Sequence, residues 1–212
     1  KKKKKLVTLS AVVLLRVYCF PARSLPDYDD TVEVRGVTAP VEVVRDNANV
    51  PHIFGETDAD VFFGLGFAHA QDRLWQLITL RRTAQGRLSE IFGPATVTTD
   101  KLMRRYDIYR LAVASADKLD PETKSALEAY SAGINARLDQ INTEALGRGA
   151  PEMWLFNAPM APWRPADSLA VTKLMGLQMS GHLEAEGLRA RVSLELSDQD
   201  RLRDILPDFF FF

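Results

Sequence analysis

Apolar and polar residues alternate in three short runs near the start of the chain. The runs Val32–Val37, Val41–Arg45 and Val50–Phe54 are rich in β-branched residues and are bounded by turn-forming residues, which is typical of strands. We expect the first two runs to pair across residues 38–40, as a hairpin or at a sheet edge. Val50 precedes a proline and therefore avoids the helical region, which fits the extended course of the third run.

A long helix is predicted from residue 58 to about residue 85. Thr57, followed three residues later by Asp60, is a signal for the start of a helix. Beyond it, apolar residues recur with helical spacing over more than half of the circumference, so the helix is well buried. Gly64 and Gly66 cost stability inside a helix. We therefore expect them to mark a close contact with another element or a local break.

The remaining pattern is helical, apart from one long loop. Helices are predicted over residues 99–116, 121–142, 166–180 and 183–196. Residues 147–165 form a loop rich in proline and aromatic residues, whose apolar content favours packing on the protein or on a partner. The chain is therefore predicted to be mostly helical with a small β portion, an α+β fold.

Composition and charge narrow the class of protein. Among 212 residues, 46% are apolar and 26% are charged, as in soluble globular proteins. Residues 25–208 hold 20 Lys and Arg against 28 Asp and Glu, a formal charge of −8. Such an acidic body argues against nucleic acid as a partner. The single Cys19 lies far from every histidine in the sequence, so neither a thiol nucleophile nor a Cys-based zinc site is expected.

The two ends of the chain differ from its body. Lys1–Lys5 precede the apolar run Leu6–Phe20, which is the pattern of a secretory signal peptide or an uncleaved anchor. Arg16 interrupts this run, which is shorter than the roughly 20 apolar residues of a spanning helix; a buried N-terminal strand or helix is the alternative. We predict a periplasmic or secreted protein, membrane-anchored if residues 6–20 are retained. Residues 1–24 are then signal or anchor, 25–208 the folded domain and 209–212 an aromatic tail.

No motif describes a self-contained active site. The sequence has no Gly-rich phosphate loop, no Gly-x-Ser-x-Gly elbow and no His-Glu-x-x-His, the motifs that carry phosphate binding, acyl transfer and zinc hydrolysis. For His52 and His69, a structural role is favoured over that of a catalytic base. Asp72 and Arg73 are adjacent in the predicted helix and point apart, so each needs another partner. A buried structural pairing is favoured there over a substrate-orienting role.

Two glutamates lie near the start of the last predicted helix. Glu184 and Glu186 could supply oxygen ligands to a hard cation such as calcium, although two carboxylates fall short of its usual six to eight or so ligands. On spacing alone, a solvated helix face is favoured over a metal site.

Several stretches together resemble the α-chain of the penicillin acylase family, which belongs to the N-terminal-nucleophile hydrolases. The similarity runs from about Val32 to Pro207. Its most specific part is the string Gly-Phe-Ala-His-Ala-Gln-Asp-Arg-Leu-Trp-Gln-Leu at residues 66–77. The other matching stretches are Val41–Asp46, Val50–Ile53, Gly86–Gly93, Ala129–Asn135, Trp163–Ser168 and Leu183–Glu186.

The resemblance implies an α-subunit that completes a four-layer αββα fold with a separate β-chain. In this family a periplasmic precursor cuts itself into two chains, and the β-chain begins with the nucleophilic serine. The free α-amine of that serine acts as the base, and a pKa of about 7.7–8.0 suits this role at neutral pH. The heterodimer would hydrolyse the amide bond of an N-acylated small molecule, either a β-lactam or an acyl-homoserine lactone. The present chain itself would carry no catalytic residue.

The resemblance also assigns binding residues. Residues 177–182, among them Gln178, Gly181 and His182, resemble the stretch that lines the acyl pocket. Penicillin G acylases have a bulky Arg-Phe pair where this chain has Gly181-His182, which implies a differently shaped pocket. Glu184 is the best match for the carboxylate that the α-chain gives to a structural calcium ion shared with the β-chain, and Glu186 is the next best.

A different function remains open beside the hydrolase subunit. The alternative is a non-enzymatic helical interaction module, or an inactive remnant, anchored by its N-terminal segment. A complete enzyme that uses His52 or His69 is disfavoured, because neither has a nearby nucleophile in the sequence. A subunit, unlike a complete protein, should expose a large apolar surface when it is alone.

Overall fold

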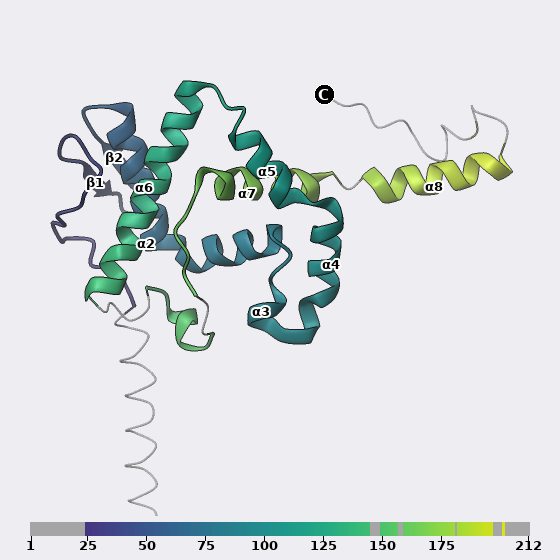
Figure 1. Cartoon of the computed structure of the whole chain (residues 1–212), viewed down its shortest axis with the longest axis horizontal. Helices are drawn as coiled ribbons and strands as arrows, with labels where there is room; N and C mark the ends of the chain where they lie inside the picture. The colour runs from purple at the N-terminus through teal and green to yellow at the C-terminus, as the bar shows by residue number, and fades with distance from the viewer. Residues whose placement is uncertain (1–23, 145–148, 157–158, 181, 197–200, 202–212) are drawn as a thin grey trace, which may run out of the picture. The chain divides into compact units, whose positions relative to one another are not determined.

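The computed structural model describes residues 24–144, 149–156, 159–180, 182–196 and 201. The predicted N-terminal segment, except Ser24, and the aromatic tail lie outside them. The described elements, in chain order, are β1 (Glu42–Arg45), β2 (Pro51–Phe54), α2 (Asp58–Ala84), α3 (Ser89–Phe92), η1 (Gly93–Thr96), α4 (Val97–Tyr106), α5 (Ile108–Ala116), α6 (Pro121–Glu144), η2 (Pro151–Trp154), α7 (Pro165–Met179) and α8 (His182–Glu195). The described chain is therefore mostly helical with one small sheet, as predicted (Figure 1).

The chain divides into two units, residues 1–171 and 172–212. The first holds the sheet, helices α2 to α6 and the start of α7, and the second holds the end of α7 and α8. In the part of the chain that the structure describes, no helix is both long and apolar enough to span a bilayer.

The sheet is a two-stranded antiparallel hairpin of β1 and β2. Its turn is closed by Asp46, whose Oδ1 accepts hydrogen bonds from the backbone N–H groups of Ala48 and Val50, both at 2.9 Å. Asn49 has a φ of 61°, in the left-handed region that asparagine enters more readily than most residues. Local side-chain chemistry therefore sets this turn and, with it, the pairing of the strands.

The predicted pairing of Val32–Val37 with Val41–Arg45 is wrong. Residues 32–37 form no strand, and β1 pairs with β2 instead. Gly36 has a φ of 107°, which breaks the extended run. The next turn is held to α2, because the backbone N–H and the hydroxyl of Thr38 donate to the Asp60 carboxylate at 2.7 and 2.8 Å.

Helix α2 confirms the predicted long helix almost to the residue. Thr57 caps it, accepting a hydrogen bond from the Asp60 N–H at 3.2 Å. Both glycines of its first half mark close contacts. A Cβ atom on Gly64 would lie 2.7 Å from Val41 and 2.8 Å from Ile53, and Gly66 faces the backbone of α6. The helix bends at Arg73, whose φ of −133° and ψ of 21° are not helical.

Helix α6 crosses α2, and the core of the first unit forms around this crossing (Figure 1). Burying one large apolar side chain of such a core contributes about 1.5–3 kcal/mol. The buried cluster consists of Ala70, Leu74, Ile78, Ile134, Leu138, Ile141, Ala150, Met153 and Trp163.

The predicted helix over residues 99–116 is two helices. Asp107, with φ of 54° and ψ of 35°, separates α4 from α5. A residue in the left-handed region cannot continue a right-handed helix, so the axis changes direction there. The predictions over residues 121–142, 166–180 and 183–196 are confirmed as α6, α7 and α8.

The aromatic loop was predicted to pack either on the protein itself or on a partner. Its described residues pack on the protein itself. Trp163 is buried, and its backbone exchanges two hydrogen bonds with the Asn135 amide, at 2.6 and 2.9 Å. Phe156 stacks on Trp75 with ring centroids 5.3 Å apart. The Arg81 guanidinium donates to the carbonyl of Ala161 at 3.0 Å. These contacts fix the described parts of the loop against α2 and α6.

Candidate functional site

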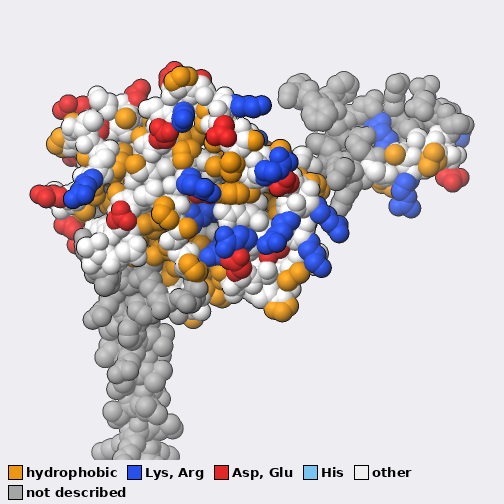
Figure 2. Space-filling model, in the orientation of Figure 1, with side chains coloured by type: hydrophobic (Ala, Val, Ile, Leu, Met, Phe, Trp, Pro, Cys, Tyr) orange, Lys and Arg blue, Asp and Glu red, His pale blue; other side chains and the backbone are white. Residues whose placement is uncertain are grey.

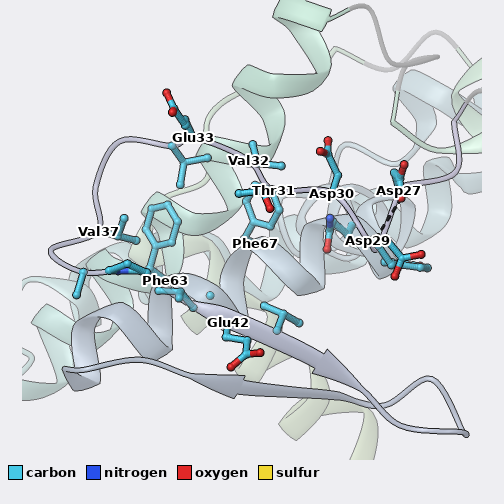
Figure 3. Close-up of a pocket in the computed structure, with 18 of the residues that line it drawn as sticks. Asp27, Asp29, Asp30, Thr31, Val32, Glu33, Val37, Glu42, Phe63 and Phe67 are labelled. Carbon is cyan, nitrogen blue, oxygen red and sulfur yellow. Dashed lines mark hydrogen bonds between the residues drawn. The ribbon is translucent and has the colours of Figure 1, made fainter.

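A groove of about 890 Å³ lies between residues 27–43 and the first half of α2. The rings of Phe63 and Phe67 reach from α2 toward the segment that contains Val32 and Val37 (Figure 3). Gln71 follows one helical turn later on the same wall. The groove thus has an apolar floor, formed where an irregular segment lies along a helix.

Carboxylates line the groove without converging on one point. Figure 3 shows the side chains of Asp30 and Glu33 directed away from the two aromatic rings. Asp27 is engaged locally, accepting a hydrogen bond from the Asp29 N–H at 3.1 Å. In the described part of the chain, no group of three or more His, Cys, Asp or Glu side chains could hold a metal ion. These acids therefore give the rim a negative charge but no cation site.

Arg45 of β1, which lines the groove, forms an ion pair with Asp72 of α2. The two side chains make two hydrogen bonds, at 2.9 and 3.0 Å. They are only 11% and 21% exposed. The hydroxyl of Tyr28 donates to the same carboxylate at 3.0 Å, and the Arg45 guanidinium lies 3.9 Å from the centre of the Tyr28 ring. Burial and the neighbouring Asp72 raise the pKa of Tyr28, which keeps it a hydrogen-bond donor.

This arrangement answers the question of the adjacent charges in α2. Asp72 pairs with Arg45 rather than with Arg73, whose guanidinium lies 3.5 Å from the Gln76 side-chain oxygen. Each charge therefore has a partner of its own, but neither Asp72 nor Arg73 is buried, so the predicted buried pairing is wrong. We call the three residues Tyr28, Arg45 and Asp72 the clamp. It holds the segment around Tyr28, the hairpin and α2 together.

The histidines outside α8 make contacts typical of structural residues. Nδ1 of His69 lies 2.9 Å from the Tyr130 hydroxyl of α6, and burial lowers the pKa of His69, so its ring is neutral at pH 7. His52 lies beside the Asp46 carboxylate at 3.4 Å on the exposed hairpin. Among the hydrogen bonds within the described residues, neither ring meets a Ser, Thr or Cys side chain.

The residues assigned by resemblance lie in the second unit. Gln178 is exposed near the end of α7, and Gly181 lies outside the described residues. His182, Glu184 and Glu186 are in α8, but their side chains are outside the description. Positions two apart on a helix differ by about 200°. The two glutamates therefore stand on different faces, and their assignments, like those of the pocket residues, stay predictions.

Sequence reasoning missed a buried carboxylate that organises the start of α7. Asp167 is 1% exposed. It accepts hydrogen bonds from the Arg164 N–H and the Tyr109 hydroxyl, both at 2.8 Å, and lies 3.5 Å from the Arg81 guanidinium. The sequence does hold one signal for this role. Asp167 follows two residues after Pro165, which opens α7, and an acid in the first turn of a helix can accept hydrogen bonds from the free backbone N–H groups there. Its partners Tyr109 and Arg81 are too distant in sequence to be foreseen.

A second missed carboxylate, Asp100 of α4, holds the turn after α2. Its oxygens accept hydrogen bonds from the backbone N–H groups of Leu88 and Ser89, both at 2.8 Å. Burial acts to raise the pKa of Asp100, but the hydrogen bonds from Ser89 and Leu88 outweigh it and lower the pKa. Both missed acids are therefore structural anchors that fix helix starts and turns.

Comparison with known proteins identifies the family. Residues 40–209 match the family described as Penicillin amidase, so the chain belongs to the penicillin amidase family and the resemblance is confirmed. It is 38% identical over 159 residues to the penicillin acylase 2 proenzyme of Pseudomonas sp. (strain SE83), covering 74% of this chain and 20% of that protein. It is 32% identical over 184 residues to the acyl-homoserine lactone acylase QuiP of Pseudomonas syringae pv. tomato, covering 84% and 21%.

A solved structure shows the same fold. The thermostable penicillin G acylase from Alcaligenes faecalis superposes with a TM-score of 0.62 at 24% identity. The superposition covers 81% of this chain and 93% of that solved chain. By contrast, the chain spans about a fifth of the length of the curated relatives it matches.

Proposed function

We propose that this chain is the α-subunit of a penicillin acylase-like amidohydrolase that cleaves the amide bond of an N-acylated small molecule. The observation that carries the proposal is the extent of the similarity. The family match spans residues 40–209, and the chain covers 93% of a solved penicillin G acylase chain but about a fifth of a proenzyme. A matched region that spans nearly all of one solved chain and only a fifth of a proenzyme supports the assignment of these residues to one subunit.

The chemistry is proposed to lie in the separate β-chain, which begins with a serine. Its α-amine takes the proton of the serine hydroxyl as the oxygen attacks the amide carbonyl, and the same proton leaves with the amine product. Water then hydrolyses the acyl-enzyme, and donors of the β-chain stabilise the oxyanion. The contacts of His52, His69 and the clamp are consistent with this division, since all three are engaged in structural roles.

The acyl pocket is proposed to include Gln178, Gly181 and His182. A glycine and a histidine in place of the Arg-Phe pair of penicillin G acylases change both volume and charge at this wall. The matched relatives are named for penicillins and for acyl-homoserine lactones, so both substrate classes are candidates. The smaller Gly181 favours a more open pocket, which suits an aliphatic acyl chain.

The calcium site is proposed to take one ligand from this chain, Glu184, with Glu186 as the second candidate. Calcium prefers carboxylate and carbonyl oxygens, so the donor chemistry fits. Only one of two residues on different faces of α8 can meet a given ion, and the described residues offer no cluster that could complete the shell. The remaining ligands would come from the β-chain. Bound calcium would then tie α8 to the catalytic chain.

The enzyme is proposed to be periplasmic or secreted, because residues 1–24 have the pattern of an export signal or anchor. Retention of residues 6–20 would leave the αβ unit attached to the membrane. Intact mass of the mature chain, with and without detergent extraction, distinguishes cleavage from retention.

The test of the proposal is expression of the native full-length gene, followed by intact-mass measurement and N-terminal sequencing of every chain that co-purifies. We expect a larger chain that begins with Ser, and release of the amine from β-lactam or acyl-homoserine lactone substrates. Replacement of that Ser by Ala should abolish both the processing and the hydrolysis. If no second chain is found, the non-enzymatic interaction module or inactive remnant is the better description.

A further inference from the structure

One face of α4 is exposed and basic. Lys101 and Arg105 lie four residues apart, so one helical turn places both side chains on the same face, and Arg104 beside them is exposed too. The only acid within α4, Asp100, is buried and accepts hydrogen bonds from the turn after α2. Within the residues that the structure describes, neither Lys101 nor Arg105 forms an ion pair. Helix α4 therefore presents positive charge that no acid of the helix offsets.

The acids nearest to α4 in the sequence are paired with other cations. Asp107, which follows α4, pairs with Arg110, and Glu90 of α3 pairs with Arg87. The domain as a whole is acidic, with a formal charge of −8 over residues 25–208. Exposed charges more than about 10 Å apart are largely screened at 0.1 M salt. The local charge of α4, rather than the average of the domain, therefore decides what this face attracts.

Apolar side chains lie among the basic ones. Val97 and Leu102 are 37% and 43% exposed. Each lies within one helical turn of a basic residue, so both share the exposed side of α4. Figure 2 shows Lys and Arg side chains gathered over the part of the first unit where α4 and α5 lie, with hydrophobic side chains between them. A basic amphipathic helix is typical of an element that lies on a membrane surface. We call Val97, Lys101, Leu102, Arg104 and Arg105 the basic face.

We propose that the basic face docks on an anionic lipid surface, with its cations at the headgroup phosphates and Leu102 at the edge of the acyl region. Charge complementarity supports this partner, because each Lys or Arg near an anionic leaflet adds to the attraction. The pattern of residues 1–24, a lysine cluster before an apolar run, predicts export or anchorage, and either would bring the folded domain to a membrane. The inference concerns location and does not depend on the proposed hydrolysis, so each can fail without the other.

The test is co-sedimentation of the protein, expressed from its native full-length gene, with vesicles of phosphatidylcholine that contain or lack phosphatidylglycerol. One variant combines Lys101→Gln with Arg105→Gln. The control combines Lys124→Gln with Lys173→Gln, which removes the same charge from exposed positions of α6 and α7. We expect the first variant to bind the phosphatidylglycerol vesicles about tenfold or more weakly, and the control to bind them as the unsubstituted protein does. All variants keep residues 1–24, so binding by that segment is common to them.

An environment-sensitive fluorescent residue at position 102, with position 124 as its control, reports contact even if another segment holds the protein to the vesicle. Its emission should shift to shorter wavelength on phosphatidylglycerol vesicles at position 102 and stay unchanged at position 124. Absence of the shift at position 102 overturns the inference. Equal losses of binding in the two double variants also overturn it, because net charge rather than the basic face would then be responsible.

Three further results would assign the basic face to a different partner and overturn the inference. Release from vesicles by inorganic phosphate, beyond that by chloride at the same ionic strength, indicates a site for a soluble anion. Binding of duplex DNA that is lost in the Lys101→Gln, Arg105→Gln variant indicates a nucleic-acid surface. Dissociation of a co-purifying chain in that variant indicates a contact between subunits.

Discussion

Gly66 of α2 and Gly133 of α6 meet at the helix crossing, each against the main chain of the other helix. A Cβ atom on Gly66 would lie 2.0 Å from the Tyr130 carbonyl oxygen, and one on Gly133 would lie 1.9 Å from the Phe63 carbonyl oxygen. Both distances are far below van der Waals contact. Because backbone atoms cannot rotate away as a side chain can, the crossing at this distance requires glycine on both helices.

Alanine at either position should therefore destabilise the protein. Alanine favours a helix by about 1 kcal/mol over glycine, but overpacking costs about 1–3 kcal/mol or more, and a backbone clash belongs at the upper end. We expect Gly66→Ala and Gly133→Ala each to lower the free energy of unfolding by about 2 kcal/mol, measured by urea denaturation. Gly176→Ala in α7 is the control, since nothing lies within 4 Å of its added methyl. It should be neutral or stabilising; a Gly66→Ala variant that behaves like it would contradict the crossing.

Local features of this fold could be predicted from sequence, and the reason is physical. The start of α2 depends on Thr57 and Asp60, which are three residues apart, and the sequence identifies both. The glycines of α2 could be flagged as contacts, but the sequence does not reveal that Gly66 faces the backbone of Tyr130 in the distant α6. The strand predicted over residues 32–37 is wrong for a similar reason, because a residue distant in sequence, Asp60 of α2, holds the next turn through Thr38. Alternation of apolar and polar residues indicates an extended segment, but it does not indicate which other segment of the chain it will pair with or pack on.

In the candidate site, too, the sequence indicates local features but not the partners that lie far away along the chain. The sequence indicates that Asp72 needs a partner, yet Arg45 and Tyr28 become its partners only when the hairpin and the segment around Tyr28 pack on α2. The proposed calcium and pocket residues depend on a second chain. Their roles therefore come from the family resemblance, and no periodicity in this sequence could supply them.

The clamp should contribute measurably to stability. Asp72→Asn removes the charge and leaves the Arg45 guanidinium, only 11% exposed, without its ion pair. Hydrogen bonds to charged groups contribute about 1.5–3 kcal/mol, so we expect a loss of about 2 kcal/mol in urea denaturation. As a control, Asp107→Asn breaks the exposed pair with Arg110, whose side chains are 46% and 69% exposed. Such surface pairs contribute about 0–1 kcal/mol. Equal losses of unfolding free energy in the two variants would contradict the stabilising role of the clamp.

Asp60 should make the free energy of unfolding depend on pH in the acid range. Hydrogen bonds from the Thr38 backbone and from the hydroxyls of Thr57 and Thr38 lower the pKa of Asp60 from 3.8 to about 2. A carboxyl whose pKa is lower in the folded state stabilises the fold above its ordinary pKa, and that stabilisation is lost as the pH falls toward the folded value. The free energy of unfolding should therefore drop between about pH 4 and pH 2.

Asp60→Asn should be less stable at pH 7 and should lose less stability across this acid range. Asp58→Asn is the matched control, because it removes an exposed charge from the same helical turn without touching either threonine. Unfolding by urea at several pH values gives both slopes. If the slope of Asp60→Asn matches that of the unsubstituted protein, the hydrogen bonds to Asp60 are not the cause of the acid sensitivity.

Replacement of the proposed calcium ligand should loosen the metal. In the processed αβ enzyme, Glu184→Gln should reduce calcium retention by roughly ten- to a hundredfold, by analogy with the effect of losing one supporting group of a metal site. The readout is metal content after dialysis against graded chelator. Glu186→Gln on the other face of α8 is the comparison: if it alone releases the ion, the ligand is Glu186, and if neither does, this chain gives no carboxylate to the metal.

The string at residues 66–77, through which this chain most resembles its family, holds Gly66 of the crossing, His69 bonded to Tyr130, and Asp72 of the clamp. All three are engaged within the chain. The same scaffold can therefore serve enzymes of different selectivity, as relatives named for penicillins and for acyl-homoserine lactones indicate. Under the proposed function, the acyl pocket lies instead at the end of α7, outside this string. The contacts of this string therefore account for the architecture of the chain, and the proposed function assigns selectivity to the few residues beyond Leu177.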